Sequence, residues 1–253
     1  MDLNSDLGEG FGIWRLGDDL ALLGVVTSAN VACGFHAGDP STMRRVCFAA
    51  AERGVAVGAQ VGYRDLAGFG RRRIDYDPGE LRDDVLFQIG ALDGFCRVAG
   101  TTLRYVKPHG ALYNTAAVDE VQASAVVAAV QEYDPSLPVL CQPSSVLWSS
   151  ALSSGLRTVA EGFADRAYQP DGRLVPRSVA GAVVSDVDEV VARAVRMAVS
   201  RSVVAIDGSV VACPVDSLCV HGDTAGAVEL ARRVRSALLA EGLPVEPFHP
   251  RSA

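Results

Sequence analysis

The sequence predicts a (β/α) barrel of the TIM type, and three observations support this prediction. First, short apolar runs typical of strands alternate with longer amphipathic runs typical of helices from end to end. This alternation implies parallel strands joined by right-handed crossovers, and seven or eight such units fit a barrel. Second, ionisable residues recur where the strands end. Third, the 253 residues, 49% of them hydrophobic, supply material for a full core. A doubly wound open sheet is the alternative.

The strand-like runs are spaced along the whole chain. The run 28–33, for example, ends in Val31, Ala32 and Cys33 and leads into a loop that closes with Asp39 and Pro40. In chain order, we expect strands at 2–6, 28–33, 55–60, 103–107, 138–141, 158–163, 202–206 and 218–220.

Amphipathic runs between these strands predict the helices. Three of them begin with a helix start signal: Asp39 is followed by proline, and Asp119 and Asp186 stand where N-caps belong. The expected helices lie at 40–53, 79–99, 119–132, 144–154, 186–200 and 224–241. The longest expected loop is 164–178, and no Pro-, Gly- or Ser-rich linker interrupts the chain, so we expect a single domain over 1–253.

Composition excludes several classes of function. The net charge of −7 argues against a nucleic-acid surface. No apolar run reaches the roughly 18 residues of a membrane helix, and the first ten residues lack the pattern of a signal peptide. The six cysteines are scattered singly, which favours reduced, buried thiols. These features predict a cytoplasmic protein without membrane contact.

Polar residues gather at the carboxyl ends of the expected strands. In a parallel barrel these ends open on one face, which holds the active site in barrel enzymes. Three of the four histidines stand there, whereas His249 lies in the polar tail. The candidate residues are Asn4, Asp6, Glu9, Asn30, His36, Gln60, Lys107, His109, Gln142, Glu161, Asp165, Arg166, His221 and Asp223.

Structural roles are the alternative for several candidates. A lone histidine after a strand is more often a structural residue than a catalyst, and Asp6 or Glu161 could cap loops. Asn114 could end a helix. Arg72, within a run of three arginines, could grip a carboxylate or phosphate or could simply be solvated. The segment GEGFG at 8–12 fails the dinucleotide spacing, and no G-x-x-x-x-G-K-[ST] motif occurs.

Seven motifs, in order along the chain, together resemble the LamB/YcsF family. They are DLNSDLGEGFG, SANVACGFHAGDP, YRDLAGFGRR, VKPHGALYN, EGFADRAY, LVPRS and CVHGD. The resemblance implies a barrel of the glycoside hydrolase/deacetylase type. It also implies a part in ATP-dependent 5-oxoprolinase, in which two partner subunits, B and C, join this chain in converting 5-oxoproline and ATP into glutamate, ADP and phosphate.

This resemblance assigns roles to the candidates. We expect the partners to phosphorylate the lactam, since this chain has no nucleotide motif, and this subunit to add water to the activated carbon. His36 and His109 are candidates for acid or base because their ordinary pKa lies closest to neutrality. Asp6 or Glu161 would orient a histidine or activate water, and Lys107 and Arg72 would hold anionic groups. Asn4, Asn30 and Asn114 would be neutral donors, with Glu9, Asp165, Arg166, His221 and Asp223 around the substrate.

One residue departs from the family pattern. Gln60 stands in GAQV, where members of the family usually have histidine. Glutamine cannot act as a base at neutral pH. The chain is therefore impaired or specialised if that histidine is essential, whereas Gln60 can replace it if it only donates a hydrogen bond. A divalent metal is possible, because Asp/His clusters bind metals in related deacetylases, but no compact ligand motif assigns one.

Two other functions remain open from the sequence. A free-standing metal-dependent deacetylase or amidohydrolase would act on a carbohydrate or small amide without ATP. A non-catalytic binding subunit would tolerate the loss of residues such as Asp6 or His109.

Overall fold

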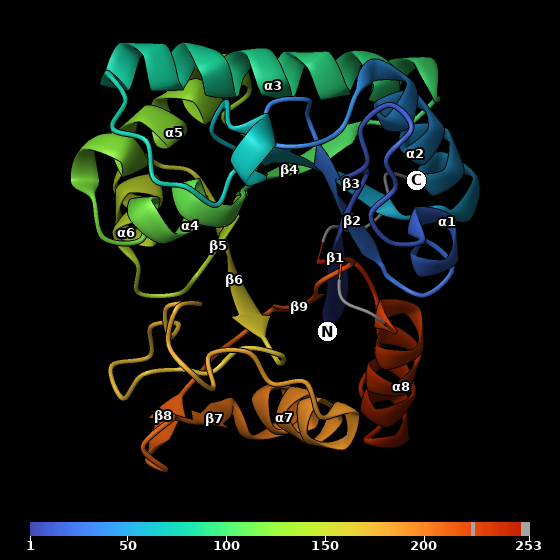
Figure 1. The fold of residues 1–253 in the computed structure, drawn as a ribbon, viewed down its shortest axis with the longest axis vertical. Helices are drawn as coiled ribbons and strands as arrows, with labels where there is room; N and C mark the ends of the chain where they lie inside the picture. The colour runs from blue at the N-terminus through green and yellow to red at the C-terminus, as the bar shows by residue number, and fades with distance from the viewer. Residues whose placement is uncertain (224–225, 249–253) are drawn as a thin grey trace.

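The protein folds as a closed barrel of seven parallel strands, as the sequence predicts (Figure 1). The computed structural model describes residues 1–223 and 226–248. The strands follow the chain around the barrel until the last one, β9, closes it between β6 and β1. They are β1 (Asp2–Leu7), β2 (Ser28–Ala32), β3 (Ala56–Val61), β4 (Leu103–Pro108), β5 (Val139–Cys141), β6 (Thr158–Phe163) and β9 (Ser217–Val220).

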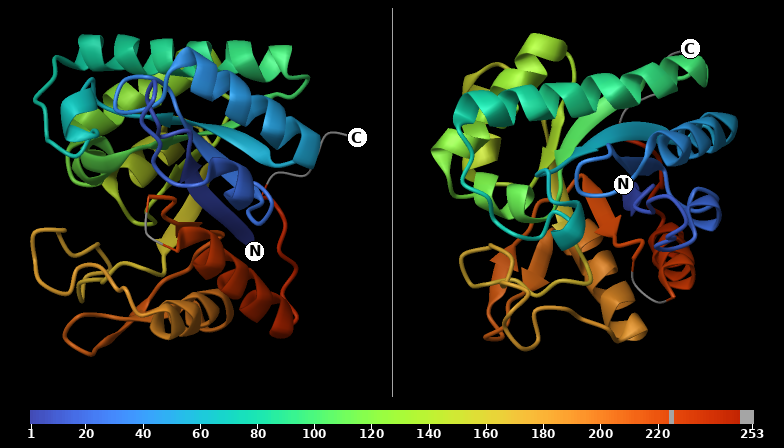
Figure 2. Two further views of the ribbon diagram at one scale, coloured as in Figure 1. Left: turned by 45° about the vertical axis from the view of Figure 1, so that its right-hand side comes forward. Right: turned by 45° about the horizontal axis from the view of Figure 1, so that its top comes forward.

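Helices cover the outside of the barrel, which the two further views show from other sides (Figure 2). The expected helices are α2 (Pro40–Arg53), α3 (Pro78–Val98), α5 (Glu120–Tyr133), α6 (Val146–Ser153), α7 (Val187–Ser200) and α8 (Ala227–Ala240). Asp39, Asp119 and Asp186 each accept hydrogen bonds from backbone amides of the first turn, so their predicted role as N-caps is confirmed. The helix expected from residue 224 begins at Ala227, and residues 224–225 lie outside the described part of the chain.

One predicted strand lies outside the barrel. The run expected at 202–206 forms β7 (Ser202–Val204), which pairs antiparallel with β8 (Val210–Ala212) in a separate hairpin. The expectation that it follows the barrel pattern is therefore wrong. The turn at Asp207 and Gly208 is too short for a crossover helix, so the next strand pairs locally instead.

Three short helices of the described chain, near the open end of the barrel, were not predicted from the sequence. They are α1 (Asp19–Leu22), the 3₁₀ helix η1 (Leu66–Gly68) and α4 (Gly110–Ala116), and none is long enough to show a clear amphipathic period. Among the described residues, no helix is long and apolar enough to cross a membrane.

The strand register brings polar side chains into the interior of the barrel. Asp6 lies opposite Asn30, and Gln60 lies opposite Lys107. Because alternate residues of a strand point to the same side, Asn4 lies below Asp6 along the barrel axis. Lower still, the Tyr105 ring crosses beside Gly58, where any Cβ would overlap it. The polar groups therefore sit above an aromatic floor, at the end of the barrel where the strands finish.

Candidate active site

An ion cluster on Lys107 occupies the upper barrel. The ammonium nitrogen lies 3.0 Å from Oδ1 of Asp6 and 2.7 Å from Oε1 of Glu161, and it also donates to Sγ of Cys219 at 3.4 Å. The two acidic side chains and the lysine side chain are all at most 8% exposed. A buried ammonium needs such partners, since an isolated buried charge is very costly.

The charge states within this cluster follow from its geometry. Burial opposes the charged form of each group and is the largest single influence at Asp6, but Lys107 and smaller contributions from neighbouring groups together outweigh it and lower the Asp6 pKa. At Glu161 burial dominates, and the pKa is raised despite Lys107. Burial would lower the Lys107 pKa, but Asp6 and its neighbours raise it. Lys107 is therefore a fixed cation and Asp6 a fixed anion, and neither is suited to act as a base near neutral pH.

Two asparagines support this cluster from below. Nδ2 of Asn30 donates to Oδ1 of Asp6 at 2.8 Å and to Oδ1 of Asn4 at 2.7 Å. The Tyr105 hydroxyl donates to Oδ1 of Asn30 at 2.6 Å, and Nδ2 of Asn4 donates to Ser217. Both asparagines are fully buried, so they position Asp6 rather than contact a ligand as expected.

The carboxamide of Gln60 joins three other candidates. Its Oε1 lies 3.1 Å from Nε2 of His36, and its Nε2 lies 3.1 Å from Nδ1 of His109 and 3.2 Å from Oε1 of Glu9. Nε2 of His109 lies 3.0 Å from the carbonyl oxygen of Phe69. These contacts are all satisfied when both histidines are neutral and protonated on Nε2, because the amide then donates twice and accepts once. Gln60 thus acts as a hydrogen-bond donor and acceptor at the centre of this group.

Burial keeps the two histidines neutral. It lowers the pKa of His109 to about 4 and that of His36 well below its ordinary value. Burial raises the pKa of Glu9, and the charges of Asp6 and Asp223 add to this effect. Since both ring nitrogens of His109 are occupied, it would have to break a hydrogen bond before it could accept a proton. His36 is fully buried and, contrary to the expectation from its loop position, does not line the cavity.

A third group combines Asp165, His221 and Arg177. Nδ1 of His221 lies 2.5 Å from Oδ2 of Asp165, and Nη2 of Arg177 donates to Nε2 of His221 at 3.2 Å. The carboxylate therefore fixes the proton on Nδ1 and leaves the lone pair of Nε2 directed towards Arg177. This is the arrangement in which an acid orients a histidine as a general base.

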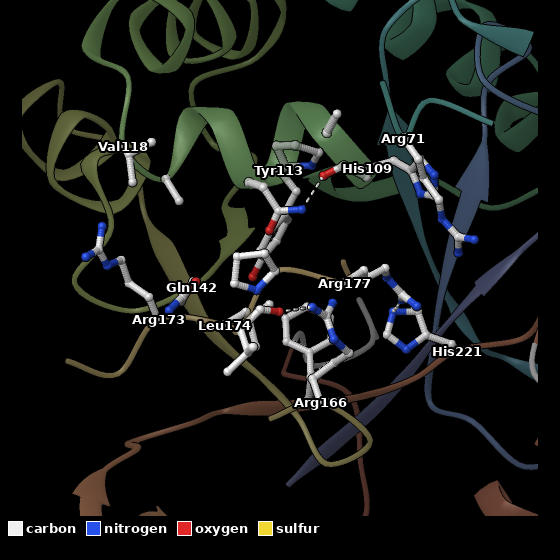
Figure 3. Close-up of a pocket in the computed structure, with 18 of the residues that line it drawn as sticks. Arg71, His109, Tyr113, Val118, Gln142, Arg166, Arg173, Leu174, Arg177 and His221 are labelled. Atoms are coloured by element: carbon white, nitrogen blue, oxygen red, sulfur yellow. Dashed lines mark hydrogen bonds between the residues drawn. The ribbon is translucent and has the colours of Figure 1, made fainter. Parts of the chain in front are cut away.

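Members of all three groups line a cavity of about 560 Å³ at the open end of the barrel (Figure 3), namely Asp6, Lys107, His109, Arg177 and His221. That volume is in the usual range for small-molecule sites. Asp6 is the only carboxylate on its wall among the described residues, while the cations there are Arg71, Lys107, Arg166, Arg173 and Arg177. Apolar and neutral residues complete the wall, including Tyr113, Asn114, Gln142, Phe163 and Leu174. The lining favours an anionic ligand.

Four candidates, Arg72, Asn114, Glu161 and Asp165, take places that the sequence did not indicate. Arg72 does not line the cavity but pairs with Asp65, and its side chain is 67% exposed. Its neighbour Arg71 lines the cavity instead and pairs with Asp223 at 2.8 Å. Asn114 lines the wall but donates to the carbonyl oxygen of Gly110 in its own helix. Glu161 and Asp165 stand behind the wall and act through Lys107 and His221.

Arg177 and Tyr113 also line the wall, although neither was predicted from the sequence to do so. Arg177 belongs to the motif LVPRS within the long loop 164–178, so the motif was visible while the path of its loop was not. His249 lies outside the described residues.

Within the described part of the chain, two groups of side chains have the composition of a metal site. In the first, ligand atoms of Glu9, His36 and His109 lie within 4.8 Å of one another, but the Gln60 carboxamide hydrogen-bonds to all three. In the second, formed by Asp6, Cys219 and His221, Lys107 contacts the carboxylate and the thiol. Amide hydrogens and an ammonium oppose a metal cation, so neither group fits a divalent ion as it stands.

Comparison with known proteins gives the family. The LamB/YcsF family profile matches residues 1–253. The chain is 59% identical to the A subunit of 5-oxoprolinase from Nocardia farcinica over 98% of this chain and 99% of that protein. It is 61% identical to the protein of the same name from Streptomyces avermitilis, over 98% of this chain and 99% of that protein.

Among solved structures, the lactam utilization protein from Thermus thermophilus matches with a TM-score of 0.93 and 45% identity, over 98% of this chain and 99% of that one. A putative cellobiose-phosphate cleavage protein from Enterococcus faecalis, at 14% identity and a TM-score of 0.54, shares the fold alone over 98% of this chain and 96% of that one. The ordered motifs, the seven-stranded barrel and the relatives that match nearly its whole length agree, and the chain belongs to the LamB/YcsF family.

Proposed function

We propose that this chain is the ring-opening subunit of an ATP-dependent 5-oxoprolinase, which hydrolyses the lactam of 5-oxoproline to glutamate. The names of its relatives support the reaction, since proteins 58–61% identical over 98% of the chain carry the name of the A subunit of 5-oxoprolinase. The name of the Thermus thermophilus protein, lactam utilization protein, agrees with a cyclic amide as substrate.

The observation that carries the proposal is the Asp165–His221 pair at the wall of a cationic cavity. His221 lines the cavity, and Asp165 would stabilise the imidazolium that forms when Nε2 takes a proton from water. The substrate is anionic through its carboxylate, which suits a wall that carries five cationic side chains. His221, rather than His36 or His109, is therefore our candidate for the general base.

The proposed reaction begins on the partner subunits. They transfer the terminal phosphoryl group of ATP to the lactam oxygen and release ADP. In this chain, a water molecule then attacks the ring carbon while His221 takes one of its protons. The C–N bond breaks, the ring nitrogen leaves with a proton, and an acyl phosphate remains. A second water hydrolyses the acyl phosphate to glutamate and inorganic phosphate, so two waters are consumed for each ATP.

Lys107 and Asp6 would determine the electrostatic potential at the reacting carbon. The Lys107 ammonium is a fixed cation on the cavity wall and would stabilise negative charge that develops on the attacked carbon's oxygen. Glu161 and the two asparagines would hold this ammonium and its partner Asp6 in place.

We propose subunits B and C as the partners and the cytoplasm as the site of the reaction. The relatives are named as one subunit of several, and the sequence contains no phosphate-loop motif, which supports ATP use by the partners. The six free, buried cysteines are compatible with a reducing compartment. The metal-dependent amidohydrolase hypothesis is weaker, because Gln60 hydrogen-bonds to all three residues of one metal-like group and the Lys107 ammonium contacts the other.

Reconstitution of the three-subunit enzyme tests the proposal. Glutamate formation from 5-oxoproline and ATP should fall at least about 100-fold in His221→Ala, because the general base is lost. The matched control is Arg233→Gln, which removes a surface ion pair with Asp188 and should leave activity unchanged. Undiminished glutamate formation by His221→Ala, or by the partners without this chain, would contradict the proposal.

A further inference from the structure

We propose that Arg166 and Arg177 form a phosphoryl subsite, which binds the phosphate group of an O-phosphorylated lactam next to His221. This inference rests on the proposed function and extends it, because it names the residues of this chain that bind the phosphoryl group of the activated substrate. The ligand is a phosphorylated small molecule rather than the free lactam.

The charge partners of the wall cations single out these two arginines. Arg71 pairs with Asp223, Arg173 pairs with Asp171 at 2.6 Å, and Lys107 pairs with Asp6. Arg166 and Arg177 make no ion pair with a carboxylate within the described residues.

Asp165 is a carboxylate that interacts electrostatically with both arginines, and its Oδ2 is already engaged. Asp165 stands behind the wall and accepts the hydrogen bond from His221. Two guanidinium groups thus face one cavity without a hydrogen-bonded anion (Figure 3). A phosphoryl group supplies the missing oxygens.

Arg166 is a rigid half of this subsite. It is 4% exposed, its Nη2 donates to the carbonyl oxygen of Val175 at 2.7 Å, and its Nε donates to that of Ala182 at 3.2 Å. Burial and the nearby charge of Arg177 lower its pKa to about 10, so it remains a cation at neutral pH. A buried arginine held only by backbone carbonyls carries a charge that a ligand can neutralise.

Arg177 is the adaptable half and links the subsite to the base. Its side chain lies on the exposed part of the loop, and its Nη2 donates a hydrogen bond to Nε2 of His221. A phosphoryl oxygen is a stronger acceptor for a guanidinium than a neutral imidazole nitrogen. Phosphoryl binding would therefore draw Arg177 from Nε2 and free the lone pair of His221 for water. Binding of the phosphorylated substrate would thus make Nε2 of His221 available as the general base.

Binding of inorganic phosphate to the isolated full-length chain tests the subsite by calorimetry. The wild type should bind phosphate, and Arg177→Gln should weaken this binding at least about tenfold. Arg177→Lys, which keeps the charge but loses the planar fork, should fall between them. Arg233→Gln is the control and should match the wild type. Arg166→Gln should also weaken binding, with circular dichroism to confirm its fold, while the exposed Arg177 provides the test if that buried variant does not fold.

Two further measurements sharpen the test. The ¹⁵N signal of His221 Nε2 should shift when phosphate is added to the wild type and should not shift in Arg177→Gln. ATP should bind no more tightly than phosphate, because the subsite recognises the phosphoryl group alone, and tighter binding of ATP would indicate a nucleotide site instead. Equal phosphate binding by wild type and Arg177→Gln, or none by the wild type, would overturn the subsite.

The outcomes separate this inference from the proposed function. If phosphate binding is independent of Arg166 and Arg177 while His221→Ala still abolishes glutamate formation, only the subsite is wrong. If phosphate binding depends on both arginines but His221→Ala keeps full activity in the complex, the subsite stands and the ring-opening role of His221 is wrong.

Discussion

The side-chain amide of Gln60 lies 3.1 Å from Nδ1 of His109 and donates a hydrogen bond to it. The same carboxamide hydrogen-bonds to Nε2 of His36 and to Glu9, so one neutral side chain contacts three groups that could otherwise titrate or bind a metal. An imidazole has two ring nitrogens and could not make all three contacts. Gln60 is thus suited to hold a metal-free hydrogen-bond network.

Removal of this amide should create metal affinity. In Gln60→Ala the ligand atoms of Glu9, His36 and His109 lose their shared partner and should bind about one equivalent of Zn²⁺ per chain. Calorimetry and the visible spectrum of bound Co²⁺ would measure this. The double variant Gln60→Ala/His36→Ala should lose the binding. One equivalent bound by the wild type in a manner that depends on His36 would show that Gln60 does not block the site.

Replacement of Gln60 by histidine should bring no gain in activity. Gln60→His loses at least one of the three hydrogen bonds, and His109, one of the groups that Gln60 holds, lines the cavity. In the reconstituted enzyme, glutamate formation should stay equal to or below that of the wild type. A large increase would mean that position 60 needs an imidazole for the reaction.

Loss of the Lys107 ammonium should strongly destabilise the fold. Lys107→Met leaves the carboxyl groups of Asp6 and Glu161 buried without their cation, which typically costs about 3–5 kcal/mol. Urea unfolding would measure the change in the free energy of unfolding. Adding Asp6→Asn to Lys107→Met should recover part of the loss, because one uncompensated charge is removed. A change below about 1 kcal/mol in Lys107→Met would contradict the ion cluster.

The floor of the barrel makes a separate prediction about packing. A Cβ at Gly58 would overlap the ring of Tyr105, so Gly58→Ala should destabilise the protein by about 1–3 kcal/mol or more. Gly90 lies within α3, and a Cβ there meets no atom within 4 Å. Gly90→Ala should therefore be neutral or add about 0.5–1 kcal/mol of stability. Thermal or urea unfolding compares the two, and equal effects would show that Tyr105 does not fill this space.

Asp2 should make stability depend on pH in mildly acidic solution. Burial raises its pKa from 3.8 to about 6, although hydrogen bonds from Ser217, Thr27 and Ser28 lower it. The folded state therefore binds a proton more tightly than the unfolded state. This contribution to stability is fully present below about pH 4 and is lost as the pH rises through about 6, a change on the order of 3 kcal/mol.

Comparison with Asp2→Asn isolates this effect from other titrating groups. The free energy of unfolding of the wild type, minus that of Asp2→Asn, should fall between about pH 4 and about pH 6.5 and then level off. A difference that stays flat or rises over this range would show that Asp2 is charged in the folded protein throughout.

Particular residues show what the sequence could and could not predict. Asp39 and Asp119 could be predicted as helix N-caps because each side chain accepts hydrogen bonds from backbone amides only two or three residues away. The alternation of strands and helices was enough to predict the barrel. Because the carboxyl ends of parallel strands open on one face of a barrel, the sequence also predicted that Asp6 and Lys107 lie close together. The run 202–206 was wrongly predicted as a barrel strand. A barrel strand needs a crossover helix after it, and the short turn that follows this run leaves no room for one, so the run pairs antiparallel with β8. The single-domain organisation stays a prediction.

The details of the site depend on contacts between distant parts of the chain. Nothing local distinguishes Arg71, which faces the cavity, from Arg72, which pairs with Asp65. Likewise, Arg177 reaches His221 across 44 positions through the path of a long loop. The partners of Gln60 also come from three other segments, so its central place could be seen only in the folded structure.

The most direct test of the account is the activity of Asp165→Asn in the reconstituted enzyme. Asparagine keeps the size of the side chain but cannot stabilise the charged imidazolium of His221. We expect kcat for glutamate formation to fall at least about 100-fold with little change in KM for 5-oxoproline, while Arg233→Gln behaves as the wild type. Activity within about twofold of the wild type in Asp165→Asn would contradict the claim that this pair supplies the base.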